Sequence, residues 1–234
     1  LDPGVRMEYL PQNPVFQGER TVLEQVLLGL NDADRSLAEY EARTILNQLG
    51  VSRFEQSVGN LSGGERRRVA LAAVLARPCD VLILDEPTNH LDNDMVLWLE
   101  DYLRAWKGAL VMVTHDRDEA YQLCDNLLLM DRGRVLAEGR TRELFQNPVT
   151  CQAARLTGCK NISRIQRVGE RKVLALDWGG LELETELPVG DEITAVGIRA
   201  HDFEPISEGR DGELKGTPGA NLIRVQNPDI SEMH

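Results

Sequence analysis

Two acidic residues stand side by side at the end of an apolar run in this sequence. The run "DVLILD" (80–85) ends in Asp85, and Glu86 follows it directly. Because the run does not alternate and has prolines on both sides, it is typical of a strand buried on both faces. One carboxylate could hold the shell of a magnesium ion while the other deprotonates an attacking water. For an isolated pair we would favour two solvated acids at a strand end, and it is the neighbouring motifs that make magnesium-dependent nucleotide hydrolysis the better explanation.

A second candidate site lies at the start of a predicted helix. The stretch "LSGGE" (61–65) places a hydroxyl and two glycines before an apolar pattern, with Glu65 three residues after Ser62. Free N–H groups at Gly63 and Gly64 could point at a phosphate, with the helix dipole behind them. An ordinary capping box, in which Ser62 and Glu65 bond to each other's backbone, accounts for the same residues.

These residues need a sheet and helices to position them. "ALVMVT" (109–114) predicts a second buried strand, and between the two strands apolar residues recur at helical spacing from Met95 to Trp106. Strand, helix, strand is a unit of a parallel sheet, whose functional residues lie at the carboxyl ends of the strands. Upstream, we expect a helical subdomain at about residues 20–77.

The rest of the chain changes in texture. Asp116 and Glu119 are spaced for a capping box, and "NLLLMDRGRVLAEG" (126–139) predicts a hairpin before a short helix at "TRELF". From about residue 160, short alternating segments separated by Gly, Pro and Asp predict a small β domain. These segments are "KVLALDW", "LELETEL", "ITAVGIRA" and "NLIRV" (221–225).

Composition excludes several classes of function. The net charge of −12 argues against a broad phosphate-neutralising surface, so DNA is not an expected partner. The apolar runs are far too short to span a bilayer. No Cys-x-x-Cys pair or Cys/His cluster occurs, so we expect reduced thiols in a cytoplasmic protein rather than a metal site. The four cysteines are Cys79, Cys124, Cys151 and Cys159.

Five motifs in order give the sequence a specific resemblance. They are "YLPQ" with Gln12, "LSGGERRRVALA", "LILDEP", "LD" with Asp92, and "VTHD" with His115. Their order and approximate spacing resemble those of ATP-binding cassette (ABC) ATPases. The resemblance implies an α/β fold in which an incomplete ABC-type nucleotide-binding domain precedes a small β-rich domain. We place the first domain at residues 1–158 and the second, a truncated and β-barrel-like regulatory domain, at residues 159–234.

The same resemblance implies ATP and Mg²⁺ as cofactors and a role for each motif. Glu86 would be the catalytic base, His115 would contact the γ-phosphate, and Gln12 would approach the magnesium ion and the attacking water. Asp85 and Gln12 would bind Mg²⁺ through water. His90 lies within the motif text "TNHLD", and we assign it no chemistry.

The resemblance further implies a homodimer with composite sites in the full protein. Asp92 would cross the interface between the two subunits. The residues that would bind a partner subunit's ATP are Leu61, Ser62, Gly63, Gly64 and Glu65.

One motif of the family is missing from this sequence. No Gly-Lys dipeptide occurs, so the phosphate-binding loop G-x-x-x-x-G-K-[ST] (Walker A) is not present. In the family this loop precedes the motif that "YLPQ" resembles, called the Q-loop, and the sequence begins at Leu1, without Met, only eleven residues before Gln12. We therefore expect the chain to be a fragment, and whether it hydrolyses ATP by itself stays open.

Two subfamilies resemble different parts of the chain. Residues 1–117, with "DEPTNHLD", resemble F-type ABC proteins, which act on ribosomes and lack membrane domains. Residues 118–234, with "AARLTGCKNIS" and "VGIRAHDF", resemble molybdate- or sulfate-type importer ATPases, whose C-terminal domain is regulatory. A natural mosaic, a recombined gene or a joining of two sequences would each place a seam near residues 114–120.

We favour the importer, because a small β domain after the cassette has no place in the F-type plan. The expected function is an ATPase subunit on the cytoplasmic face of the cell membrane. It would couple ATP binding and hydrolysis to transport of an oxyanion such as molybdate through permease subunits, and its C-terminal domain would bind the oxyanion. The alternatives are an F-type protein on the ribosome and a non-catalytic module.

The absence of a phosphate-binding loop generates a first prediction. The 234-residue chain should bind MgATP weakly or not at all, since that loop supplies the amides and the lysine that hold the β- and γ-phosphates. Isothermal titration calorimetry measures the affinity. Tight binding by the isolated chain would contradict the role given to the missing loop.

Overall fold

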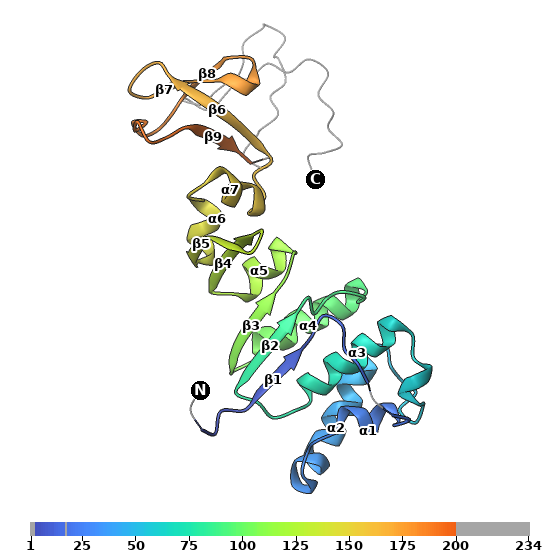
Figure 1. The fold of residues 1–234 in the computed structure, drawn as a ribbon. Helices are drawn as coiled ribbons and strands as arrows, with labels where there is room; N and C mark the ends of the chain where they lie inside the picture. The colour runs from blue at the N-terminus through green and yellow to red at the C-terminus, as the bar shows by residue number, and fades with distance from the viewer. Residues whose placement is uncertain (1–2, 17, 200–234) are drawn as a thin grey trace, which may run out of the picture. The chain divides into compact units, whose positions relative to one another are not determined.

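The computed structural model describes residues 3–16 and 18–199 (Figure 1). The chain divides into two compact units between Asp125 and Asn126. The strand predicted at residues 221–225 lies outside the described residues. Among the described residues, no helix is both long and apolar enough to cross a membrane.

The first unit contains a parallel sheet of three strands, in the order β1-β2-β3 (Figure 1). Strand β2 (Val81–Asp85) lies in the middle, between β1 (Met7–Leu10) and β3 (Ala109–Val113). The register sets Asp85 opposite Val113. The two apolar runs of the sequence are therefore confirmed as neighbouring parallel strands, and their carboxyl ends meet at one edge of the sheet.

Helices account for most of the rest of this unit, as the sequence predicted for residues 20–77. A 3-10 turn (Val58–Asn60) precedes α3, and the glycines of "LSGGE" open α3 itself. The helices are α1 (Val22–Val26), α2 (Asp32–Gln48), α3 (Gly63–Leu75), α4 (Asn93–Ala105) and α5 (Arg117–Leu123).

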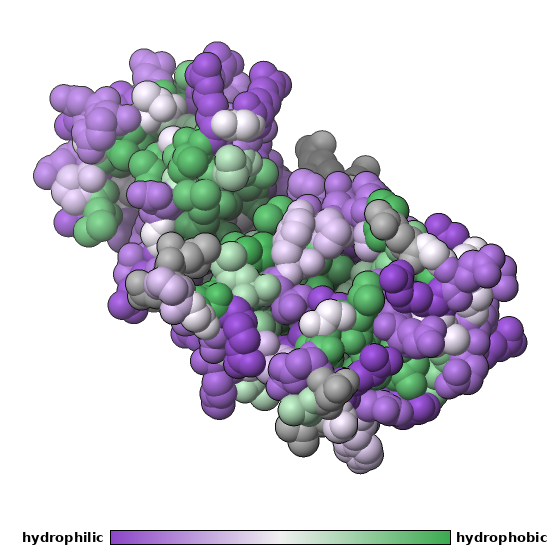
Figure 2. Space-filling view, turned by 60° about the horizontal axis from the view of Figure 1, so that its bottom comes forward, coloured by the Kyte–Doolittle hydropathy of each residue, from purple (hydrophilic) through white to green (hydrophobic). Residues whose placement is uncertain are grey.

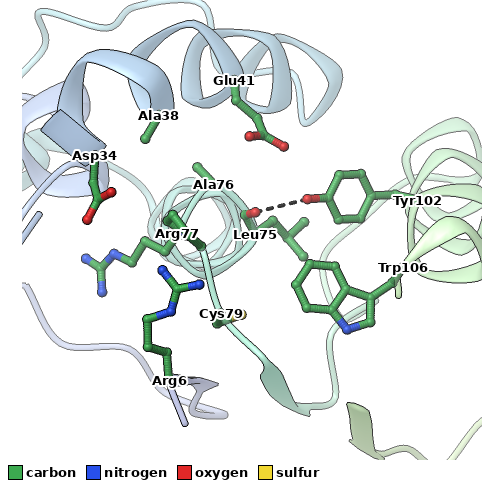
Figure 3. A pocket seen from close by; sticks show the side chains of 11 residues that line it. Arg6, Asp34, Ala38, Glu41, Leu75, Ala76, Arg77, Cys79, Tyr102 and Trp106 are labelled. Carbon is green, nitrogen blue, oxygen red and sulfur yellow. Dashed lines mark hydrogen bonds between the residues drawn. The ribbon is translucent and has the colours of Figure 1, made fainter. Parts of the chain in front are cut away.

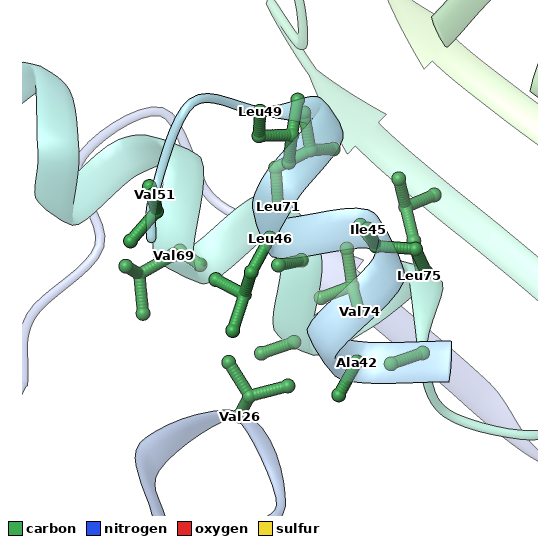
Figure 4. Packing of buried hydrophobic residues seen from close by; sticks show 14 of the residues in the cluster. Val26, Ala42, Ile45, Leu46, Leu49, Val51, Val69, Leu71, Val74 and Leu75 are labelled. Atoms are coloured by element: carbon green, nitrogen blue, oxygen red, sulfur yellow. The ribbon is translucent and has the colours of Figure 1, made fainter. Parts of the chain in front are cut away.

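Helix α3 lies at the centre of the hydrophobic core. All its side chains from Val69 to Leu75 are buried. Figure 4 shows Ile45 and Leu46 of α2 and Val26 of α1 packed around it. Leu82 and Leu84 of β2 are fully buried in the same cluster. The helix is thereby held between the sheet and the other helices.

The sheet differs from the prediction on one point. The sequence predicted strands buried on both faces, whereas β2 alternates between buried and half-buried side chains. On β3, Val111 and Val113 are 51% and 52% exposed. On the other face of the sheet Leu82 and Leu84 are buried but Leu110 and Met112 are half-buried, and the space-filling view also shows hydrophobic residues among the hydrophilic ones (Figure 2). An apolar run carries no information about which of its faces will find a neighbour.

The second unit begins with the predicted hairpin, which pairs β4 (Asn126–Asp131) with β5 (Arg134–Arg140). Two short helices follow, α6 (Thr141–Gln146) and α7 (Cys151–Leu156). A four-stranded antiparallel sheet has the order β8-β7-β6-β9. Its strands are β6 (Asn161–Arg167), β7 (Lys172–Ala175), β8 (Leu181–Glu184) and β9 (Ala195–Ile198), with a 3-10 turn at Leu176–Trp178.

A small core of its own supports this antiparallel sheet. Val173, Ala175 and Leu183 are buried together with Val189. The second unit, which begins at Asn126, includes the hairpin and both short helices, so it begins earlier in the chain than the predicted boundary between residues 158 and 159. That boundary stays a prediction.

The burial of β2 allows a test of the core. Leu84→Ala should lower the free energy of unfolding by roughly 2–5 kcal/mol, because the side chain is fully buried and its removal leaves a cavity. The matched control is Leu97→Ala on α4, where the side chain is 60% exposed and the loss should stay within about 1 kcal/mol. Urea denaturation measures both, and equal losses would contradict the packing described.

Candidate functional site

Strand β2 delivers two carboxylates to the edge of the sheet. Asp85 is its last residue, and Glu86 follows in a left-handed backbone conformation, with φ of 51°. Such a conformation is uncommon for a residue with a side chain and is maintained only when the surroundings hold it. The N–H of Glu86 donates to the Val113 carbonyl at 2.8 Å, and the residue is 6% exposed. The backbone thus turns sharply while Glu86 stays buried.

His115 lies against this buried carboxylate. Its Nε2 is 3.1 Å from Oε1 of Glu86, and its side chain is 93% exposed. Because β2 and β3 are parallel and in register, the residues that follow them are brought to the same edge. The structure therefore brings the predicted base, Glu86, into direct contact with His115, the residue predicted to contact the γ-phosphate, and the histidine lies on the solvent side.

Local hydrogen bonds fix the loop that carries His115. Asp116 caps α5 and accepts from the N–H groups of Asp118 and Glu119, as the sequence predicted. The Glu119 carboxylate accepts from the Thr114 hydroxyl at 2.7 Å. The acid expected to complete a capping box is therefore bound to the strand end that precedes the histidine.

At the start of α3, Ser62 and Glu65 form the capping box that the sequence left open. The Ser62 N–H and hydroxyl donate to Glu65 Oε2 at 2.9 and 2.7 Å, and the Glu65 N–H donates to Ser62 Oγ at 3.3 Å. These bonds, first the one from the Ser62 hydroxyl and then the one from its N–H, hold the pKa of Glu65 below its ordinary value. The structural interpretation of this pair is thus correct as far as its own contacts go.

The two glycines between them remain available. Gly63 and Gly64 are the first residues of α3, where N–H groups have no acceptor within the helix. A Cβ added at Gly63 would meet nothing within 4 Å, and one added at Gly64 would lie 3.7 Å from the Cβ of His90. Open space therefore lies beside Gly63, whereas His90 and Arg68 lie beside Gly64.

The other predicted site residues occupy simpler positions. Asp92 is exposed and caps α4, where it accepts from the Met95 N–H at 3.0 Å. Gln12 is exposed just after β1. Leu61, directly before Ser62, is buried in the core of the first unit. An interface role for Asp92 and a nucleotide role for Leu61 stay predictions.

Arg67 is a site residue that the sequence reasoning missed. This buried side chain of α3 donates to the backbone carbonyls of Gln12, Asp85 and Glu86. It stands within the run "ERRR", where three adjacent arginines look alike in the sequence. The only available signal was its place three residues before the buried Ala70, on the inward face of a helix.

The donor set suits a magnesium ion held together with phosphates. Mg²⁺ prefers carboxylate oxygens and keeps waters and phosphate oxygens in its shell, so one or two protein carboxylates suffice. Asp85 and Glu86 supply such oxygens at one strand end. No group of three or more His, Cys, Asp or Glu side chains in the described part of the chain could hold a metal by itself. The residues fit a metal that arrives with a nucleotide.

A cavity of about 270 Å³ lies at the opposite ends of the strands (Figure 3). Tyr102 and Trp106 line one side, and Arg6 and Arg77 lie on the other. Tyr102 donates to the Leu75 carbonyl at 3.0 Å, and burial raises its pKa to about 12. Ligands of parallel sheets bind at the carboxyl ends of the strands, so this cavity is not the candidate site.

Comparison with known proteins gives a family match for this part of the chain. The family model described as "ABC transporter" matches residues 2–89, which include Gln12, the start of α3 and both acids of β2. A solved "Structure of ATP binding subunit of ABC transporter" has a TM-score of 0.55 at 22% identity and covers 65% of this chain and 68% of its own. A dimeric post-hydrolysis state of the ATP-binding cassette MJ0796, with ADP and Pi, has a TM-score of 0.51 at 23% identity over 59% and 64%. The fold is that of ABC ATPases.

Three curated relatives are similar over longer stretches. YfmR of Bacillus subtilis, an uncharacterized ABC transporter ATP-binding protein, is 34% identical over 61% of this chain and 28% of its own. The energy-dependent translational throttle protein EttA of Mycobacterium tuberculosis is 32% identical over 77% and 37%. The molybdate/tungstate import ATP-binding protein WtpC of Pyrococcus horikoshii is 31% identical over 89% and 61%. The chain thus spans less than two thirds of each relative.

The capping box at α3 generates a prediction about pH. Ser62→Ala should raise the pKa of Glu65 toward its ordinary value near 4.5, because the hydroxyl bond that lowers it is lost. The bond's contribution to stability is present above the unfolded-state pKa and disappears as the pH falls through the lowered folded-state pKa. The variant should therefore be less stable by about 1 kcal/mol at pH 7, and the part of this loss that comes from the Glu65 carboxylate should disappear at low pH, while the part that comes from the Glu65 N–H bond to Ser62 Oγ remains.

Carboxyl NMR titration follows Glu65, and urea denaturation at several pH values follows the stability. The matched control is Thr21→Ala, which removes the equivalent capping box of α1. It should raise the pKa of Glu24 and leave the pKa of Glu65 unchanged. An unchanged Glu65 titration in Ser62→Ala would contradict the geometry at this helix start.

Proposed function

Because residues 2–89 belong to the ABC transporter family, we propose that the chain is the larger part of an ABC-type ATPase domain whose Glu86 acts as the base in ATP hydrolysis. The observation that carries the proposal is the contact of the buried Glu86 carboxylate with the exposed His115 at the carboxyl end of β2. A base needs a fixed position and access to a water, and this pair offers both at the boundary between core and solvent.

The remaining residues divide the work of binding. Asp85, with Gln12, would hold a magnesium ion through water, and that ion would neutralise charge on the phosphates of ATP when it is bound. Gln12 would also touch the attacking water, and His115 would donate to the γ-phosphate. These roles require both a phosphate-binding loop and the nucleotide.

A partner subunit would complete each site. The N–H groups of Gly63 and Gly64 remain without acceptors inside their helix, and open space lies beside Gly63. We propose that they bind the γ-phosphate of ATP held by a second copy, that Ser62 assists them, with Leu61 and Glu65 shaping the helix start, and that Asp92 lies at the dimer interface. The similarity in fold to a dimeric cassette supports this arrangement.

We further propose that the ATPase serves import of an oxyanion, such as molybdate, through permease subunits at the cytoplasmic face of the membrane. The match to a molybdate/tungstate import protein extends over 89% of the chain, and the second unit has a separate antiparallel sheet where a regulatory, oxyanion-binding domain is expected. A ribosome-associated function is the second candidate, because the relative EttA aligns over 77% of the chain.

Glu86→Gln tests the catalytic proposal in the protein that carries this segment downstream of a phosphate-binding loop. ATP hydrolysis should fall by at least about 100-fold, since removal of a general base costs roughly that much. ATP-dependent dimers should persist, because the exchange leaves the metal carboxylate Asp85 in place. Phosphate release measures the first effect and gel filtration with ATP measures the second.

The matched control is Glu55→Gln, which makes the same exchange at an exposed residue of the first unit and should leave turnover unchanged. Unchanged turnover in Glu86→Gln would refute the assignment of the base. Binding of molybdate, as opposed to cosedimentation with ribosomes, then separates the importer from the ribosome factor.

A further inference from the structure

Arg67 places a charged side chain in the core of the first unit. It is 4% exposed, and it projects from the first turns of α3. Its Nη1 donates to the carbonyls of Pro11 and Gln12, and its Nη2 donates to those of Asp85 and Glu86, at 2.6 and 2.5 Å. One guanidinium therefore bonds to the backbone at the ends of two strands from the helix that begins with the glycines.

The surroundings act on the pKa of this guanidinium in two opposite directions. Burial lowers the pKa of Arg67, and the nearby carboxylates of Asp85 and Glu86 act in the opposite direction. A buried charge is tolerated only when polar groups compensate it, and here the two Nη atoms bond to backbone carbonyls, whereas the buried Nε has no hydrogen-bond partner. The planar fork of arginine can serve two separate stretches of backbone at once, whereas a lysine offers a single point charge.

Glu86 needs such support more than its neighbours. Its left-handed backbone is intrinsically unfavourable, and the hydrogen bonds around it explain why it persists. Its N–H is held by Val113, and its carbonyl accepts from Arg67 and from the Asn89 N–H at 3.3 Å. Of the two donors to that carbonyl, the guanidinium gives the charge-assisted and therefore stronger bond.

We propose that Arg67 is a positioning residue that fixes Glu86 and Gln12 relative to the N-terminus of α3. It acts through carbonyl groups and touches no reacting atom. In consequence, a shift of α3 would move the base and the glutamine together. This proposal rests on the roles given to Glu86 and Gln12 in the proposed function. It adds a physical link between the N-terminus of α3, which would bind the partner's phosphate, and these two residues.

The test measures local order in the 234-residue chain and needs no nucleotide. Arg67→Met removes all the donors, and Arg67→Lys keeps the charge but not the fork. In both variants the Glu86 and Asn89 amides should exchange with deuterium at least about tenfold faster, the size expected when a hydrogen bond to a charged group is lost. Amides of Leu71 and Val74, deep in α3, should keep their rates.

Arg66→Met is the matched control. Arg66 is the preceding residue of the same helix and is exposed. Its side chain donates to the carbonyls of Leu61 and Gly59, which lie away from Glu86 in the chain. It should leave the exchange of Glu86 and Asn89 unchanged.

The imidazole resonances of His115 give a second readout, which a merely structural role would not move. In the original chain Glu86→Gln should shift these resonances, because the two side chains are in contact. In the Arg67→Met background the Glu86→Gln substitution should produce less than half of that shift in the His115 resonances.

Three outcomes would overturn the proposal. The first is unchanged exchange at Glu86 and Asn89, and the second is faster exchange spread equally over β2 and α3, which is what a general loss of stability produces. The third is unfolding of both Arg67→Met and Arg67→Lys, since a residue that cannot be changed without unfolding is structural. A failure of Glu86→Gln to slow ATP hydrolysis would refute the proposed function instead and would leave these exchange rates as they are.

Discussion

The burial of α3 is the constraint on which the rest of the first unit depends. From Val69 to Leu75 this helix is apolar on every side, so it can be stable only between two other layers. The sheet supplies one layer, and α1 and α2 supply the other (Figure 4). Because a helix is rigid, packing of its last turns also fixes its first turn. The packing of the residues from Val69 to Leu75 therefore also positions the glycines, the capping box and Arg67 at the start of the helix.

The first turn of α3 has two proposed roles, helix capping and phosphate binding, which look mutually exclusive in the sequence. A capping box uses the N–H groups of the N-cap residue and of the third helical residue, which here are Ser62 and Glu65. The N–H groups of Gly63 and Gly64 lie between them and take no part. Structural capping therefore leaves these two donors of the turn available for the phosphate that we propose they bind.

The sequence predicted those parts of the site that depend on local pattern. The apolar runs ending at Asp85 and Thr114 became adjacent parallel strands, and Asp116 caps the next helix. Strand β1 was missed because its four residues show little of the apolar run that marked the others. The left-handed turn at Glu86 and the burial of Arg67 were also missed, since each arises from contacts between segments far apart in the chain.

The choice between the two proposed functions cannot come from the site. A match over 77% of a 234-residue chain, as for EttA, or over 89%, as for WtpC, has to include residues 114–120, so both relatives align across the predicted seam. Glu86 and His115 follow strands of a sheet with the fold of ABC ATPases, and the roles that we propose for them are the same under both functions. Whatever distinguishes transport from action on a ribosome must therefore act on other surfaces, and the separate core of Val173, Ala175 and Leu183 gives the second unit the means to carry such a surface without disturbing the first.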